Sequence, residues 1–222
     1  LQIAGQYNQR KEYDIVRSAT NTSPQLDLSI LTMSEDLSWE HPRWRQLTGT
    51  VGLSAVQQEN SYAGRYFIPN YNLYGFGGYA IEKWQHHQWE VQGGIRWDYK
   101  RIDASRVKTA TDVIDNNFNF NTLASSWNLL YKAGTAWKFN LALSMASRAP
   151  HVNELLSDGI HHGTATYEKG DLNLVPEKSF NLSLGINWKS NNNRWYADVL
   201  GYTNHIRDFI YQQPKPNDPV LT

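Results

Sequence analysis

The side chains best suited to binding chemistry lie in one polar stretch of the sequence, residues 151–171. It holds imidazole and carboxylate groups together, namely His151, Glu154, Asp158, His161, His162, Glu168 and Asp171. Imidazole nitrogens and carboxylate oxygens are ligands that suit zinc, iron and copper. Their spacing is loose, and adjacent histidines in an extended chain point to opposite sides. The stretch is therefore a candidate metal or heme site, with a solvated surface loop as the alternative.

Motifs for catalysis are absent from the sequence. It contains no G-x-S-x-G elbow, no P-loop, no H-E-x-x-H and no G-x-G-x-x-G. Serine, histidine and aspartate are plentiful, but no spacing indicates a triad. We therefore expect a protein that is not an enzyme.

The composition narrows the class of protein. Lys+Arg and Asp+Glu both number 21, so no basic surplus favours a nucleic-acid partner. Cysteine is absent, which excludes disulfides and thiolate metal sites. The mean hydropathy is −0.61, and no run of ~18 apolar residues predicts a spanning helix. The chain nevertheless has 9 Trp, 13 Tyr and 7 Phe, a combination typical of a sugar- or base-stacking surface or of the aromatic girdle of a membrane barrel.

Alternation with a period of two positions these groups on strands. From Phe180 to Trp188 every even residue is apolar and every odd one is small or polar, and 89–99 and 137–145 repeat the pattern. Weaker or noisier versions complete a set of nine segments, at 1–9, 26–32, 47–55, 71–82, 122–132 and 195–211. The sequence therefore predicts an all-β fold, an antiparallel up-and-down meander of about nine strands.

The connections between these segments alternate in length. Short ones lie at about 37–43, 84–88, 132–136 and 189–194, and long ones at about 11–25, 57–70, 101–117 and 148–177. In a meander, alternate connections emerge at the same end of the sheet. Tight turns at one end and long loops at the other are typical of outer-membrane barrels, where the long loops are extracellular.

Tryptophan gathers at the short connections. Seven of the nine lie there, namely Trp39, Trp44, Trp84, Trp89, Trp137, Trp188 and Trp195. An indole places its ring in an apolar phase and its N–H in a polar one, which the lipid headgroup layer provides. This pattern favours a membrane-interface girdle and part of a larger transmembrane β-barrel.

The membrane interpretation assigns the two faces of each strand. Apolar side chains should face lipid, namely Phe180, Leu182, Leu184, Ile186, Val91, Ile95, Leu141 and Leu143. Polar side chains should face the lumen, namely Gln92, Arg96, Asp98 and Asn187. The alternative is a soluble barrel or sandwich, in which the apolar face forms a closed core.

Loop and strand-entry motifs then indicate a family. Residues 147–159 (SRAPHVNELLSDG) resemble the arginine-proline box of TonB-dependent outer-membrane receptors. Residues 172–179 (LNLVPEKS) are similar to that family's entry into the next strand, and 202–211 (YTNHIRDFIY) to its strand ending. The resemblance implies structural roles for Arg148, Pro150, Pro176 and Glu177, with Glu177 as the carboxylate partner of Arg148.

The resemblance also implies a function. Receptors of this family are 22-stranded barrels in the outer membrane of Gram-negative bacteria, contact its lipid, and are filled by an N-terminal plug domain that the TonB complex engages. They import metal chelates, so an iron-siderophore, heme or a zinc complex would be the transported ligand and not a resident cofactor. The odd strand count and the two apparently cut ends predict that residues 1–222 are a partial transmembrane barrel domain without the plug. A passive porin and a soluble ligand-binding β domain remain the alternatives.

Overall fold

The computed structural model describes residues 1–13, 23–109, 112–161 and 166–215. Nine strands form one antiparallel sheet in the order β1-β2-β3-β4-β5-β6-β7-β10-β11. Their bounds are β1 Gln2–Glu12, β2 Leu26–Glu40, β3 Leu47–Gly64, β4 Asn70–His86, β5 Trp89–Thr109, β6 Asp112–Ala133, β7 Trp137–Arg148, β10 Glu177–Lys189 and β11 Tyr196–Arg207. Each strand pairs with its neighbour in this order, so the predicted nine-stranded meander is confirmed.

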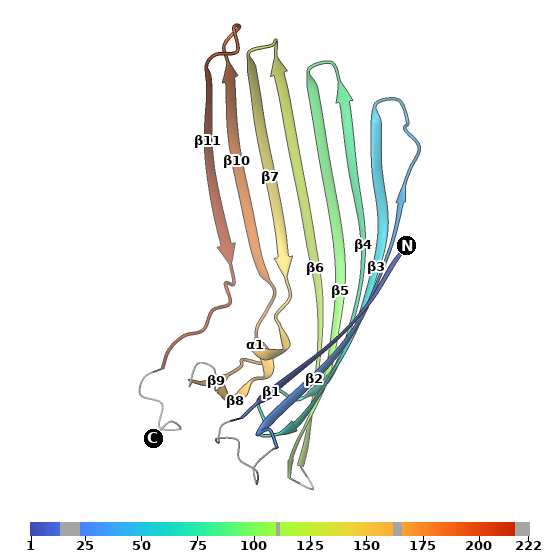
Figure 1. Ribbon diagram of the computed structural model, residues 1–222, viewed down its shortest axis with the longest axis vertical. Helices are drawn as coiled ribbons and strands as arrows, with labels where there is room; N and C mark the ends of the chain where they lie inside the picture. The colour runs from blue at the N-terminus through green and yellow to red at the C-terminus, as the bar shows by residue number, and fades with distance from the viewer. Residues whose placement is uncertain (14–22, 110–111, 162–165, 216–222) are drawn as a thin grey trace.

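One connection contains further structure. Between β7 and β10 lie α1 (Val152–Leu156) and a small two-stranded sheet of β8 (Asp158–His161) and β9 (Thr166–Lys169). Figure 1 shows the tight turns of the large sheet at one end and these three elements at the opposite end. In the described ranges α1 is the sole helix, and no helix there has the length and apolar character needed to cross a membrane.

Two of the predicted long loops are wrong in their bounds. Strand β3 continues to Gly64 and β4 begins at Asn70, so most of 57–70 belongs to a strand. Strands β5 and β6 occupy 101–109 and 112–117 in the same way. Apolar alternation weakens there, but the backbone ladder continues, for example between Ile102 and Phe118. These two strands of 21 and 22 residues are about twice as long as a tilted membrane crossing requires.

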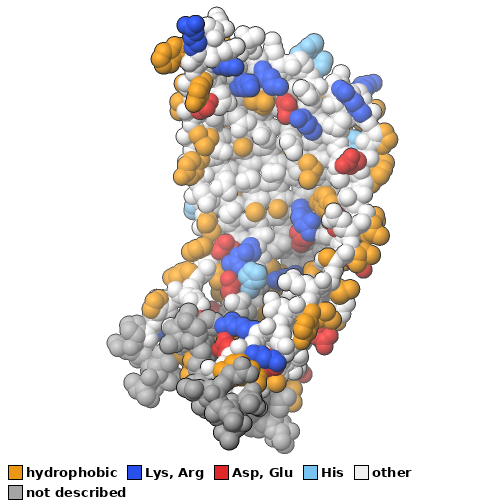
Figure 2. Space-filling view, viewed as in Figure 1, with side chains coloured by type: hydrophobic (Ala, Val, Ile, Leu, Met, Phe, Trp, Pro, Cys, Tyr) orange, Lys and Arg blue, Asp and Glu red, His pale blue; other side chains and the backbone are white. Residues whose placement is uncertain are grey.

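The sheet is curved, and its concave face is hollowed (Figure 2). Alternate residues point to this face, as the ladder Asp36–Ser54–Gly77–Asp98 illustrates. The same parity and register place the predicted lumen residues Gln92, Arg96, Asp98 and Asn187 on the concave face. The eight predicted lipid-facing residues, Phe180, Leu182, Leu184, Ile186, Val91, Ile95, Leu141 and Leu143, lie on the convex face.

The apolar side chains of the convex face are exposed and do not form the closed core that the soluble alternative predicts within the described residues. Leu184 is 56% exposed, Ile95 53% and Leu143 46%, although a soluble barrel or sandwich would bury its apolar face. Within the described residues the sheet is open, with β1 and β11 as its edges. The arrangement is that of part of a barrel wall.

The tryptophans follow a slanted line across the sheet. Trp137 and Trp188 are direct partners near their turn, with ring centroids 6.2 Å apart. The ladder row of Trp39 runs through Val51, Ala80, Ile95, Ser125 and Met145 to Phe180. Phe180 precedes Trp188 by eight positions on β10. The turn-end tryptophans are therefore displaced by eight residues over the six steps from β10 to β2.

The buried apolar core lies at the other end, inside the curve. Its members come from the concave face and from two connections, namely Leu26, Leu28, Phe67, Ile68, Tyr71, Leu73, Ile102, Ala104, Phe120, Val152, Leu155 and Leu156. The connection after β7 is thus folded inward and packed against the wall. This packing positions the groups described next.

Candidate functional site

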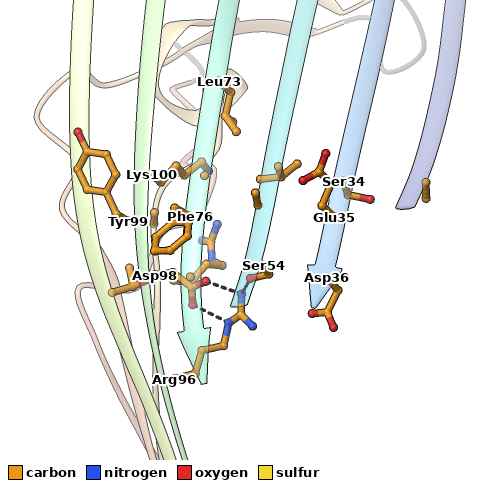
Figure 3. A pocket seen from close by; sticks show the side chains of 18 of the residues that line it. Ser34, Glu35, Asp36, Ser54, Leu73, Phe76, Arg96, Asp98, Tyr99 and Lys100 are labelled. Carbon is orange, nitrogen blue, oxygen red and sulfur yellow. Dashed lines mark hydrogen bonds and ion pairs between the residues drawn. The ribbon is translucent and has the colours of Figure 1, made fainter. Parts of the chain in front are cut away.

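A hollow of about 580 Å³ lies on the concave face between the strands and the start of the connection after β7. Its wall includes Asp36, Ser54, Arg96 and Asp98, and Arg148 and His151 border it on the connection side. Figure 3 shows the strand residues pointing into this space. The hollow is therefore bounded by both acidic and basic groups.

Arg96 organises the strand side of the hollow. Its Nε donates to Asp98 Oδ2 over 2.7 Å, and its Nη2 donates to Ser54 Oγ over 2.7 Å (Figure 3). The guanidinium also lies over the ring of Tyr79, which donates its hydroxyl to Asp36 over 3.2 Å. A Cβ at position 77 would collide with the Asp98 carboxylate, so Gly77 leaves the room that this group occupies. The cluster joins four strands through charge-assisted hydrogen bonds.

Arg148 ties the connection to the end of β7. Its Nη1 donates to Glu154 Oε2 over 3.0 Å, and its Nη2 lies 3.5 Å from Glu177 Oε2. Glu154 also accepts the backbone N–H of His151 over 2.7 Å, which satisfies a free donor at the start of α1. Glu177 accepts the N–H of Ile210 over 3.1 Å. We call the Arg148–Glu154–Glu177 group the inner latch.

A second group, the outer latch, holds the other end of the folded segment. Arg106 on β5 donates to Asp158 Oδ2 over 2.6 Å, and Tyr167 on β9 donates to Asp158 Oδ1 over 2.5 Å. The Arg106 guanidinium stacks over the ring of Tyr66 at 3.7 Å from its centroid. Tyr66 in turn donates to the carbonyl of Leu156 over 3.2 Å. Both latches therefore bind α1 and its flanks to the wall.

Apolar packing between the latches completes the attachment. Val152, Leu155 and Leu156 of α1 are 7%, 1% and 7% exposed within the buried core. Pro150 is fully buried, and its carbonyl accepts a hydrogen bond from Lys100 Nζ over 3.1 Å. Since both apolar and charged contacts attach it, residues 150–158 form a docked segment and not a free loop.

Near neutral pH the carboxylates of the docked segment are ionised and its histidine is neutral. Burial alone would raise the pKa of Glu154, but the hydrogen bonds from Arg148 and from the His151 N–H lower it below its usual value. Burial also opposes ionisation of Asp158, and its bonds from Tyr167 and Arg106 again bring about a lowered pKa. Burial and the nearby Lys100 charge lower the pKa of His151, so its imidazole is neutral. Burial raises the pKa of Tyr66 to about 12.

The seven residues proposed as ligands from the sequence are not one cluster. Glu154 and Asp158 belong to the two latches, and Asp171 accepts the backbone N–H of Asn173 over 2.9 Å. Glu168 also has interaction partners in the fold, while His151 borders the hollow. The side chain of His161 and all of His162 lie outside the described residues. Among the side chains described, no three of these ligand types gather into a group that could hold a metal ion.

The other predicted residues have varied positions. Pro176 immediately precedes β10. Of the seven tryptophans, Trp39, Trp84, Trp89, Trp137 and Trp188 share the convex face by register, and Trp44 and Trp195 lie beside the turns, 69% and 70% exposed. Sequence reasoning missed Arg106, Tyr66 and Lys100, which hold the docked segment. Strand parity places Lys100 and Arg106 on the concave face with Arg96, but Tyr66 carries no such signal.

Comparison with known proteins gives a consistent result. The family model "TonB dependent receptor-like, beta-barrel" matches residues 2–222. Among solved structures, a copper transporter, OprC, superposes with a TM-score of 0.71 at 16% identity, covering 93% of this chain and 35% of that one.

Two further structures have the same fold. The FrpB iron transporter of Neisseria meningitidis (F3-3 variant) gives a TM-score of 0.61 at 14% identity, over 97% of this chain and 34% of that one. The Serratia marcescens hemophore receptor HasR, solved as a double mutant with its hemophore HasA and heme, gives 0.59 at 13%, over 82% and 33%. These matches are named as transporters and receptors, and the chain spans about a third of their length.

Proposed function

The chain belongs to the TonB-dependent receptor family through its β-barrel domain, and from this premise we propose that it contributes part of an outer-membrane receptor that imports a metal chelate. The observation that carries the proposal is the docked segment beside a polar hollow. A receptor must hold its ligand before transport, and this segment borders the hollow beside charged side chains on the concave face. Named relatives that carry copper, iron or heme support a metal-containing substrate.

In this proposal the convex face contacts lipid. The exposed apolar side chains of β5, β7 and β10 then lose their contact with water, a favourable transfer. The tryptophans at the turn end form the girdle at the periplasmic interface. The connections at the opposite end are extracellular, and the localisation is the outer membrane of a Gram-negative bacterium.

The ligand enters through the hollow. Its wall carries three cations and three carboxylates, a mixed set of charges that suits the polar groups of a metal chelate, namely Arg96, Lys100, Arg148, Glu35, Asp36 and Asp98. His151 offers a neutral imidazole at the same place. The histidines at 161 and 162 belong to the same connection and remain candidates for contact with a metal or heme. Transport then requires the receptor's own plug domain and the TonB complex.

Growth and uptake experiments test this function. Full-length receptor would be expressed in a strain without other receptors and supplied with labelled iron-siderophore, heme, copper or zinc complexes. We expect saturable uptake of one class that stops when the inner-membrane proton gradient is collapsed or TonB is deleted. Uptake that is linear in concentration and independent of TonB would establish a porin instead.

A further inference from the structure

The convex face carries a second cavity, unrelated to the hollow. It is a groove of about 350 Å³ that crosses β6, β7, β10 and β11. Two ladder rows form its floor: Trp127–Leu143–Leu182–Thr203 and Ser125–Met145–Phe180–His205. Most of these side chains are apolar, and Ser125 and Thr203 are small beside Trp127 and Phe180, which leaves a depression. Such a shape accommodates an acyl chain.

Two cations border the groove on the side of the connections. Lys178 and Arg207 are direct cross-strand partners in the next row on the same face, so their Cβ atoms are about 5 Å apart. The Arg207 guanidinium lies 5.9 Å from the ring centroid of Phe180. In the described part of the chain, no carboxylate forms an ion pair with either residue. Their charges are therefore available to an anion.

The position of these cations along the strand indicates which anion. Trp188 and Lys178 on β10 are ten residues apart, which is about 33 Å along the strand and about 25 Å in height at a tilt near 40°. The apolar band of a transmembrane barrel is about 25 Å tall. If Trp188 marks the inner boundary, Lys178 and Arg207 lie at the headgroup level of the outer leaflet.

We propose that this groove binds one phosphorylated lipid of the outer leaflet, with its phosphate at Lys178 and Arg207 and an acyl chain along Leu182, Leu143 and Trp127. The inference rests on the proposed function, since it requires the convex face to lie in the membrane. A phosphate between two cations receives charge-assisted hydrogen bonds where water is scarce. His205, one row inside, offers a further donor at the point where headgroup and chain meet.

The test uses the full-length receptor in detergent and native mass spectrometry. Diphosphorylated lipid A is titrated against the wild type, the K178Q/R207Q variant and a matched control, K11Q/R101Q. The control removes two cations of the same face that are paired with Asp27 and Asp103 and lie away from the groove. We expect the charge variant to bind lipid A about tenfold more weakly, and the control to bind like the wild type.

Further measurements distinguish binding by the groove from binding by charge alone. S125F should fill the groove and weaken lipid A binding without altering charge. Phosphatidylethanolamine should bind more weakly than lipid A to the wild type, because its own ammonium group balances the charge of its phosphate. Millimolar inorganic phosphate, which has no acyl chain, should not displace lipid A. Unchanged affinity in K178Q/R207Q, equal binding of both lipids, or displacement by phosphate would each overturn the proposal. The two hypotheses fail separately. Unchanged lipid A binding in K178Q/R207Q refutes the lipid site but leaves the receptor function intact if chelate uptake persists. Absence of TonB-dependent uptake in the wild type refutes the receptor function itself.

Discussion

Arg148 and Glu154 are six residues apart in sequence, yet they join the end of a barrel strand to an inward-folded helix through a contact of 3.0 Å. The Arg148 side chain is 37% exposed and that of Glu154 is 24%, so solvent screens the pair in part. Glu177 is the second carboxylate of the inner latch. This small group is one of three sets of contacts that hold the segment after β7 against the wall, beside the outer latch and the apolar core.

Replacing Arg148 by Gln should loosen the docked segment without unfolding the barrel. The loss is about 1 kcal/mol, as expected for a partly exposed pair, and should accelerate amide exchange over 150–158 about fivefold. Hydrogen exchange with mass spectrometry measures this. Arg101→Gln, which removes an arginine paired with Asp103 away from the segment, is the control. Identical exchange in both variants would show that the inner latch contributes nothing.

Acidification should release the same segment. The pKa values of Glu154 and Asp158 are lowered in the fold, so their stabilisation is complete above the unfolded values of about 4.5 and 3.8 and is lost as pH falls through the folded values. The lowered pKa of His151 acts in the same direction below about 6.5. Hydrogen exchange from pH 8 to pH 3, corrected for intrinsic rates, should show protection of 150–158 falling at the acid end. Constant amide protection of 150–158 down to pH 3 would contradict release of the segment by acid.

Leu155→Ala should weaken docking more than any single charge change. Leu155 is 1% exposed within the core, so the cavity left behind costs about 2–4 kcal/mol. Leu172→Ala is a matched control in the same connection, because Leu172 is 51% exposed. We expect reduced ligand uptake and heightened protease cleavage only for L155A, with equal amounts of heat-modifiable barrel in both. Equal uptake by L155A and L172A would show that ligand capture does not depend on the docked segment.

Gly159→Ala should have a similar local effect for a steric reason. A Cβ at this position would lie 2.5 Å from the carbonyl oxygen of Tyr66, so β8 must shift away from the wall. The cost should be about 1–3 kcal/mol in the stability of the docked segment. A Cβ at Gly201 meets no atom within 4 Å, which makes G201A the control. Protease cleavage in the connection should rise in G159A alone, and a resistant G159A would refute the contact.

The histidines of the connection provide the test of metal contact. Replacing His161 and His162 by Ala in the full-length receptor should reduce uptake if either imidazole binds a metal or heme iron. The neutral ring is the ligand, so wild-type binding should also weaken below pH ~6.5. Uptake and surface amount of folded barrel are measured together. Unchanged uptake of every candidate metal, chelate and heme would end the metal role.

Sequence reasoning was sufficient for the sheet where the alternation of apolar and polar residues was strong. Between Phe180 and Trp188 the apolar and polar positions alternate without exception, and both faces follow from parity. The extensions of β5 and β6 were missed because, beyond the apolar band, neither face needs a uniform character. Ile102 and Phe120 even reverse the rule, since they are apolar on the concave face.

The docked segment was beyond sequence reasoning for a different reason. The grouping of His, Asp and Glu in 151–171 predicted a ligand cluster, whereas the structure uses Glu154 and Asp158 to bind Arg148 and Arg106. The partner Arg106 is 52 residues from Asp158, and only the folded chain shows that they meet. The Arg148–Glu177 pair was available from the family resemblance, and it is present.

The slanted line of tryptophans has a consequence for protein engineering. Eight residues over six strand steps is about 1.3 residues per strand, which corresponds to a strand inclination of about 40°. Neighbouring strands of the wall are therefore staggered, and each hairpin is shifted along the strand direction relative to the preceding one. A hairpin transplanted from a related receptor would fit this wall only if it preserved that increment, because an error of one residue would turn its convex-face side chains towards the concave face.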